Sequence, residues 1–312
     1  MIEVLGRDGF TSVNNTLYTH ANGLSFAYET FGDRKDSPLI LVAGLNNQLV
    51  RWPVPFCEAL VKKGFYVIRF DNRDTGLSEW LDCPRTPSLA RQFIAKLFRV
   101  SITLPYTLDD LAEDTVGILD ALEIPAAHLV GFSMGGMICQ IAAGKYPGRV
   151  LSLTSMMSNS GAWGSGWPTL RVALQMIKRP SKNRSALDNS VQTLKMIGSS
   201  KYPVTEASLR AMILAESQRA RNPLGYFRQM AAINLAADRS ELLASLKMPV
   251  LVISGEDDPL AQVSGGIKTA SHIPHAKLQI LPGVGHDLPK PLFGDFAQMI
   301  AQNATQSCAL NI

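Results

Sequence analysis

The sequence is poor in cysteine. Its 312 residues include only four, Cys57, Cys83, Cys139 and Cys308, and no two of them form a C-x-x-C pair. A chain of this length can bury a large core without disulfides, so we expect free thiols and a reducing, cytoplasmic compartment. Cys139 lies in an apolar run, which predicts a buried thiol.

Long apolar runs are also missing. No stretch reaches the roughly 18 uninterrupted apolar residues of a transmembrane helix. The first residues include Glu3 and Asp8, without the basic start and apolar stretch of a signal peptide. We therefore expect a protein that does not associate with a membrane, either as a monomer or as a homodimer.

Charge of one sign is not concentrated anywhere in the chain. Thirty Lys and Arg residues stand against 26 Asp and Glu residues, and the net charge is +4. The basic residues are scattered, without interleaved aromatics, so nucleic-acid binding is not expected. No nucleotide-binding glycine motif and no metal-ligand cluster is present. The sequence therefore predicts no cofactor and no metal, and leaves a small molecule as the partner.

Short apolar runs alternate with helical patterns along most of the chain. Residues 16–32 predict two strands around the Asn22-Gly23 turn. Further buried strands are predicted at residues 39–43, 66–70, 127–132, 150–156, 249–254 and 277–281. Helices are predicted at residues 53–63, 108–122, 134–146, 259–271 and 292–302. This alternation indicates the α/β class, with a mostly parallel sheet and helices on both faces.

The alternation of predicted strands and helices stops between residues 159 and 246. A stretch rich in glycine and tryptophan is followed only by helical patterns, for example at residues 170–177, 208–219 and 226–237. We predict that residues 159–246 form a helical cap, or lid, inserted into a core domain. That core domain consists of residues 1–158 and 247–312.

A nucleophile is indicated by Gly131-Phe132-Ser133-Met134-Gly135, which matches G-x-S-x-G. The motif alone is weak, but here it follows a predicted strand and opens a predicted helix, the setting of a nucleophile elbow. Glycines are needed two residues either side of the serine, because the chain folds back closely on itself. We therefore predict Ser133 as the nucleophile.

Candidates for the base and the acid lie in loops that follow later strands. Serine needs a neighbouring base to take its proton, and His286 lies in a glycine-rich loop after the last predicted strand. Residues 254–259 supply three carboxylates for the acid that orients this histidine. Asp258 is preferred because it stands directly before Pro259, which can open the next helix; Asp257 is the runner-up and Glu256 is disfavoured.

The remaining site residues are predicted from their places around the nucleophile. The backbone N–H groups of Met134 and Leu45 are candidates for an oxyanion hole, since one follows the serine and the other follows Gly44 after a strand. Met156, Trp163 and Trp167 are candidate lining residues of an apolar substrate pocket.

Together these motifs resemble the α/β-hydrolase superfamily, and more narrowly bacterial hydrolases of the aclacinomycin methylesterase type. The likeness is carried by residues 44–53, 69–78, 106–110, 131–137, 149–156 and 285–289. It implies a Ser133–Asp258–His286 triad that hydrolyses a carboxylic ester through an acyl-enzyme. Within the second of these segments, we interpret Asp71 and Arg73 as an ion pair that braces a loop.

Three other activities use the same framework. A cofactor-free perhydrolase or a C–C bond hydrolase would use the same triad, and a small-molecule receptor of this fold would retain only vestigial hydrolysis. Dehalogenases and epoxide hydrolases are disfavoured, because they use a carboxylate where this chain has Ser133.

Overall fold

The computed structural model describes residues 16–83, 86–98, 100, 102–177 and 185–305. Cys308 and the first fifteen residues, with Glu3 and Asp8, lie outside this part. Within it, Cys57, Cys83 and Cys139 are free thiols, and Cys57 and Cys139 are buried. None of the helices described is long and apolar enough to cross a membrane.

An eight-stranded sheet forms the centre of the molecule, with the order β1-β2-β4-β3-β5-β6-β7-β8. The strands are β1 (Leu17–Ala21), β2 (Leu24–Phe31), β3 (Ser37–Val42), β4 (Phe65–Phe70), β5 (Ala127–Phe132), β6 (Val150–Met156), β7 (Val250–Gly255) and β8 (Lys277–Leu281). β2 pairs antiparallel with both β1 and β4, and the other pairs are parallel. The carboxyl ends of β3 to β8 therefore share one edge of the sheet.

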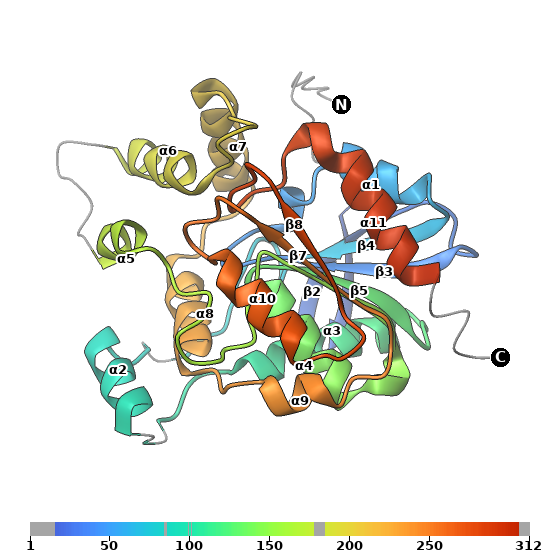
Figure 1. The fold of residues 1–312 in the computed structure, drawn as a ribbon, viewed down its shortest axis with the longest axis horizontal. Coiled ribbons are helices and arrows are strands. Elements are labelled where there is room, and N and C mark those ends of the chain that lie inside the picture. The colour runs from blue at the N-terminus through green and yellow to red at the C-terminus, as the bar shows by residue number, and fades with distance from the viewer. Residues whose placement is uncertain (1–15, 84–85, 99, 101, 178–184, 306–312) are drawn as a thin grey trace.

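Helices cover both faces of the sheet, as Figure 1 shows. They are α1 (Val54–Val61), α3 (Leu108–Ala121), α4 (Met134–Lys145), α10 (Val263–Ser271) and α11 (Phe293–Thr305), whereas α2 (Leu89–Phe98) packs against α8 (Pro223–Leu235). Leu39 and Leu41 of β3 belong to the core cluster under α1 and α11, whereas Ile40 and Val42 belong to the one under α3 and α4. Successive side chains of one strand thus fill two cores, which explains why the strands are apolar throughout.

Residues 159–246 connect β6 to β7 and contain helices but no strand among their described residues. The helices are α5 (Leu170–Ile177), α6 (Ala186–Ile197), α7 (Glu206–Arg219), α8 (Pro223–Leu235) and α9 (Ser240–Ala244). In Figure 1, α5 to α8 lie together on one side of the sheet, away from α1 and α11. We refer to residues 159–246 as the insertion.

The predicted helix at residues 259–271 is wrong in its first turn. α10 begins only at Val263, and Pro259 does not open it. The reason is Asp258, whose Oδ1 accepts hydrogen bonds from the N–H groups of Leu260 and Ala261, at 2.8 Å each. These bonds hold residues 258–261 as a loop.

A buried ion pair joins the antiparallel part of the sheet to α1. Glu29 of β2 and Arg69 of β4 face each other in register, and their side chains are 4% and 1% exposed. Arg69 also donates to the carbonyl of Trp52, just before α1, and its guanidinium lies 4.9 Å from the ring centroid of Phe31. Its charge is therefore compensated by Glu29 inside an otherwise apolar core.

We expect Glu29→Ala to lower the free energy of unfolding by about 3–5 kcal/mol, because it leaves the Arg69 cation buried and unpaired. Urea unfolding followed by circular dichroism measures this difference. The control is Lys145→Ala, which removes a half-exposed ion pair with Asp109 and should cost less than about 1 kcal/mol. Equal effects of the two substitutions would contradict the assignment.

Candidate active site

Ser133 occupies a sharp turn between a strand and a helix. β5 ends at Phe132, α4 begins at Met134, and Ser133 between them has φ 56° and ψ −118°. A positive φ is unfavourable for a residue with a Cβ, so this backbone is strained. The turn presents the Ser133 side chain at the carboxyl edge of the sheet, next to the first N–H groups of α4.

The neighbouring glycines allow this turn. A Cβ on Gly131 would collide with the carbonyl oxygen of Gly135, and one on Gly135 would collide with the carbonyl oxygen of Val42. A Cβ on Gly136 would come within 2.6 Å of the Ser158 Cβ. The backbones of β3, β5 and α4 therefore touch directly, which no larger side chain would permit.

The structure brings Ser133, His286 and Asp258 together. His286 Nε2 lies 3.0 Å from Ser133 Oγ, and His286 Nδ1 lies 2.7 Å from Asp258 Oδ2. Because a carboxylate can only accept, Nδ1 carries the proton and Nε2 is the acceptor for the Ser133 hydroxyl. The imidazole is nearly buried, and Phe132 packs against it with ring centroids 5.1 Å apart.

The three carboxylates after β7 point in different directions. Asp258 is 3% exposed and bonds to His286. Asp257 is exposed, and its Oδ2 accepts from the Ser200 hydroxyl instead. Glu256 is exposed as well. Only Asp258 of these three contacts the imidazole.

The candidate oxyanion residues lie beside Ser133. Gly44 packs so closely that a Cβ on it would be 3.2 Å from the Ser133 Cβ, and Leu45 follows it. Met134 is the first residue of α4 and is buried. Both Leu45 and Met134 line the same cavity as Ser133 and His286.

This cavity, of about 1840 Å³, lies between the carboxyl edge of the sheet and the insertion. Apolar side chains line much of it, among them Met137, Val172, Leu187, Leu194, Met212, Ile213, Tyr226, Phe227, Met230 and Leu260. Most of these come from α5 to α8. The insertion therefore supplies much of the apolar wall of the cavity.

Two of the three predicted pocket residues do not line the cavity. Met156 is fully buried in the core cluster under α1 and α11, and Met157, at φ 44°, lines the cavity in its place. Trp163 is 77% exposed and packs edge-on against Trp167, which does line the cavity. The chain turns sharply after β6, which moves the lining position by one residue.

Asp71 and Arg73 are not paired with each other, so the predicted mutual ion pair is wrong. Asp71 Oδ2 accepts from Arg219 of α7 at 2.6 Å, and Arg73 binds Asp114 of α3. A further pair joins Asp74 to Arg228 of α8 at 2.7 Å. The acids of this core loop therefore anchor the insertion.

Gln229 of α8 is a site-related residue that sequence reasoning missed. It is fully buried, its Oε1 accepts from the N–H of Asn46 at 2.8 Å, and its Nε2 donates to Thr75 Oγ1 at 2.8 Å. It therefore supports the loop that carries Leu45. The available signal is the pair of adjacent polar residues, Arg228 and Gln229, in the middle of a mainly apolar helix.

The other histidines lie outside this site. His20 is exposed, and His128 is buried between the hydroxyls of Ser37 and Ser152. Burial lowers the pKa of His128 to about 4, so it remains neutral. His272 contacts Ser240, and His275 contacts the carbonyl of Met248. In the described part of the chain, no three His, Cys, Asp or Glu side chains are grouped to hold a metal ion.

The chain is similar to known proteins over most of its length. The family model described as the alpha/beta hydrolase fold matches residues 37–289. Rhodomycin D methylesterase DnrP of Streptomyces peucetius is 29% identical over an alignment that covers 84% of this chain and 88% of the relative. 3-Oxoadipate enol-lactonase 2 of Acinetobacter baylyi is 26% identical, covering 84% and 86%.

Solved structures show the same fold. The enol-lactonase from Burkholderia xenovorans LB400 superposes with a TM-score of 0.70 at 24% identity, covering 93% of this chain and all of that one. The matched residues 37–289 include β3 to β8, the insertion, and all three residues of the Ser133 cluster. The chain therefore belongs to the α/β-hydrolase fold family.

Proposed function

We propose that this protein hydrolyses carboxylic esters, lactones included, with Ser133 as nucleophile, His286 as base and Asp258 as the acid that orients the histidine. The observation that carries the proposal is the continuous contact from Asp258 through His286 to a strained serine. A hydroxyl 3.0 Å from Nε2 is within proton-transfer reach, and Asp258 holds the opposite ring nitrogen at 2.7 Å.

The reaction runs in two halves. Ser133 Oγ attacks the ester carbonyl carbon while His286 Nε2 takes the hydroxyl proton, and the N–H groups of Met134 and Leu45 bind the oxygen as it becomes negative. His286 returns the proton to the departing alcohol, which leaves an acyl group on Ser133. Water then gives a proton to His286 and attacks the acyl carbon, and the acid departs as Ser133 regains its proton.

The names of the relatives support ester cleavage. The methylesterase covers 84% of this chain at 29% identity. The first relatives also include enol-lactonases, so ring-closed esters belong to the proposed range.

The cavity supports a bulky ester as substrate. Its volume of about 1840 Å³ exceeds the roughly 300–1,000 Å³ of ordinary small-molecule pockets. Apolar side chains from the insertion line it, and flexible methionines such as Met137, Met212 and Met230 can adapt to irregular shapes. We therefore propose a large, mainly apolar acyl or alcohol group. A panel of esters varied in these two groups tests this expectation.

We expect Ser133→Ala to lower kcat on p-nitrophenyl butyrate by roughly 10⁴- to 10⁶-fold, because it removes the atom that attacks the carbonyl. A fluorophosphonate probe should label Ser133 in the native protein, as peptide mapping would show, and should fail to label the variant. Near-native turnover by Ser133→Ala, or an adduct on another residue, would overturn the mechanism.

Asp258→Asn and Asp257→Asn form a matched pair of variants. The first should lower kcat by roughly 10⁴-fold, since an amide does not hold the imidazole in the required tautomer. The second removes a charge one residue away, on an exposed carboxylate that accepts from Ser200, and should leave kcat nearly unchanged. Steady-state kinetics of both variants decide which carboxylate acts, and the reverse order of effects would reassign the acid to Asp257.

A further inference from the structure

The loop that carries His286 is bound to the insertion along its length. We call residues 282–287 the histidine loop. The N–H of His286 donates to the carbonyl of Ile197 at 2.7 Å, and the N–H of Lys201 donates to the carbonyl of Gly283 at 3.1 Å. Ile197 is the last residue of α6 and residues 198–201 follow it, so the end of a cavity-lining helix runs beside the proposed base.

The side chains of Ser199 and Asp287 complete this contact. Ser199 Oγ accepts from the N–H of Gly285 at 3.0 Å and donates to Asp287 Oδ1. The N–H of Ser199 donates to Asp287 Oδ2 at 3.2 Å. Ser199 is therefore hydrogen-bonded to both sequence neighbours of His286, Gly285 and Asp287.

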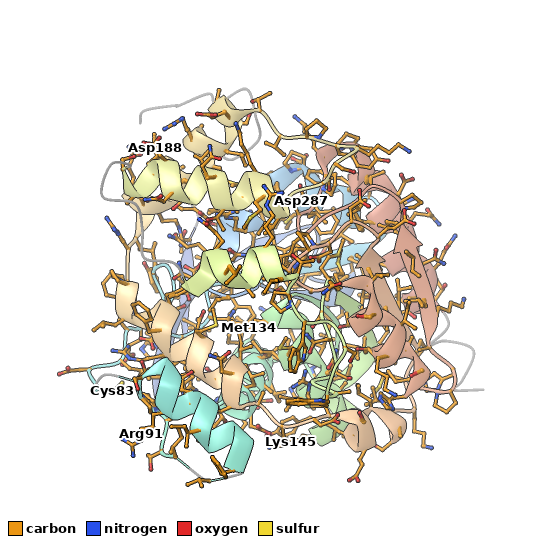
Figure 2. The ribbon with its side chains drawn as sticks, turned by 60° about the vertical axis from the view of Figure 1, so that its left-hand side comes forward. Cys83, Arg91, Met134, Lys145, Asp188 and Asp287 are labelled. Carbon is orange, nitrogen blue, oxygen red and sulfur yellow. The ribbon has the colours of Figure 1, made fainter. Side chains whose placement is uncertain are left out.

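The two backbones meet without side chains between them. A Cβ on Gly285 would lie 2.5 Å from the carbonyl carbon of Gly198 and 2.6 Å from the carbonyl oxygen of Ile197. In Figure 2, Asp287 lies near the end of α6 opposite to Asp188, which is in the first turn of that helix. The contact is thus close and is formed by the carboxyl end of α6.

We propose that Ser199 and Asp287 are positioning residues: they fix the histidine loop to the insertion so that His286 Nε2 remains directed at Ser133 Oγ. The inference rests on the proposed function. The bond to Asp258 fixes one ring nitrogen, but the place of the ring also depends on the backbone that carries it. That backbone is bonded to residues 197–199 through Gly285 and His286.

Burial supports an ordered contact here. Ser199 is 6% exposed, and burial raises the pKa of the Asp287 carboxyl while the two hydrogen bonds from Ser199 oppose this change. Loss of either side chain would leave a buried polar group without its partner. The loop would then shift toward another arrangement, and a displacement of about 1 Å can cost roughly 100-fold in rate.

The test compares Ser199→Ala, Asp287→Ala, the double variant and Ser199→Thr, which keeps a hydroxyl. On p-nitrophenyl butyrate, each Ala variant should lower kcat roughly 10- to 100-fold with little change in KM. The rate constant of fluorophosphonate inactivation should fall by the same factor. The double variant should be no slower than the slower single variant, because both remove one contact. Ser199→Thr should restore most of the rate.

Active-site titration separates positioning from folding. The fraction of molecules that react with the probe should stay unchanged, since the proposal concerns rate and not foldedness. Ser245→Ala, a substitution of an exposed serine whose hydroxyl donates to the carbonyl of Leu242 in the same turn, is the control and should leave all values unchanged.

Three results would overturn the proposal: native kcat in both Ala variants, no recovery in Ser199→Thr, or a reduced active fraction whose remaining molecules react at the native rate. Failure of the proposed function is distinguishable, because Ser133→Ala would then remain active.

Discussion

The turn at Ser133 can exist only because β5, α4 and β3 touch through their backbones. Gly131 and Gly135 leave no side chain at this contact, and the packed core around β5 and α4 holds the serine at φ 56°. Strain of this kind costs of order 1–3 kcal/mol and persists only where the surroundings enforce it. The position of the hydroxyl is therefore a property of the sheet. Asp258 and His286 are brought to it by the loops after β7 and β8, respectively.

Much of this arrangement could be predicted from local patterns. The strands were predicted to within about two residues, because each is a short apolar run bounded by turn residues. Ser133, Asp258 and His286 could be located since each follows a strand, and parallel strands deliver their carboxyl ends to one edge.

Contacts between distant segments could not be predicted in the same way. The partner of Asp71 is Arg219, 148 positions later, and no local pattern joins them. Two of the three predicted pocket residues do not line the cavity for a related reason: the turn after β6 puts Met157 there in place of Met156, and Trp163 packs at the surface. The start of α10 depended on two hydrogen bonds to one carboxylate. Each of these outcomes is decided by packing of the insertion or by a single side-chain orientation.

The pairs Asp71–Arg219 and Asp74–Arg228 have a consequence for how substrate range can change in this family. Both acids lie on the core and both arginines on α7 and α8, and the side chains are at most 9% exposed. An unmatched buried charge costs several kcal/mol. A foreign insertion grafted onto this core would therefore need arginines at both places, or a simultaneous loss of both acids. New specificities should thus arise more readily by exchange of cavity-lining methionines and leucines within the existing helices than by replacement of the whole insertion.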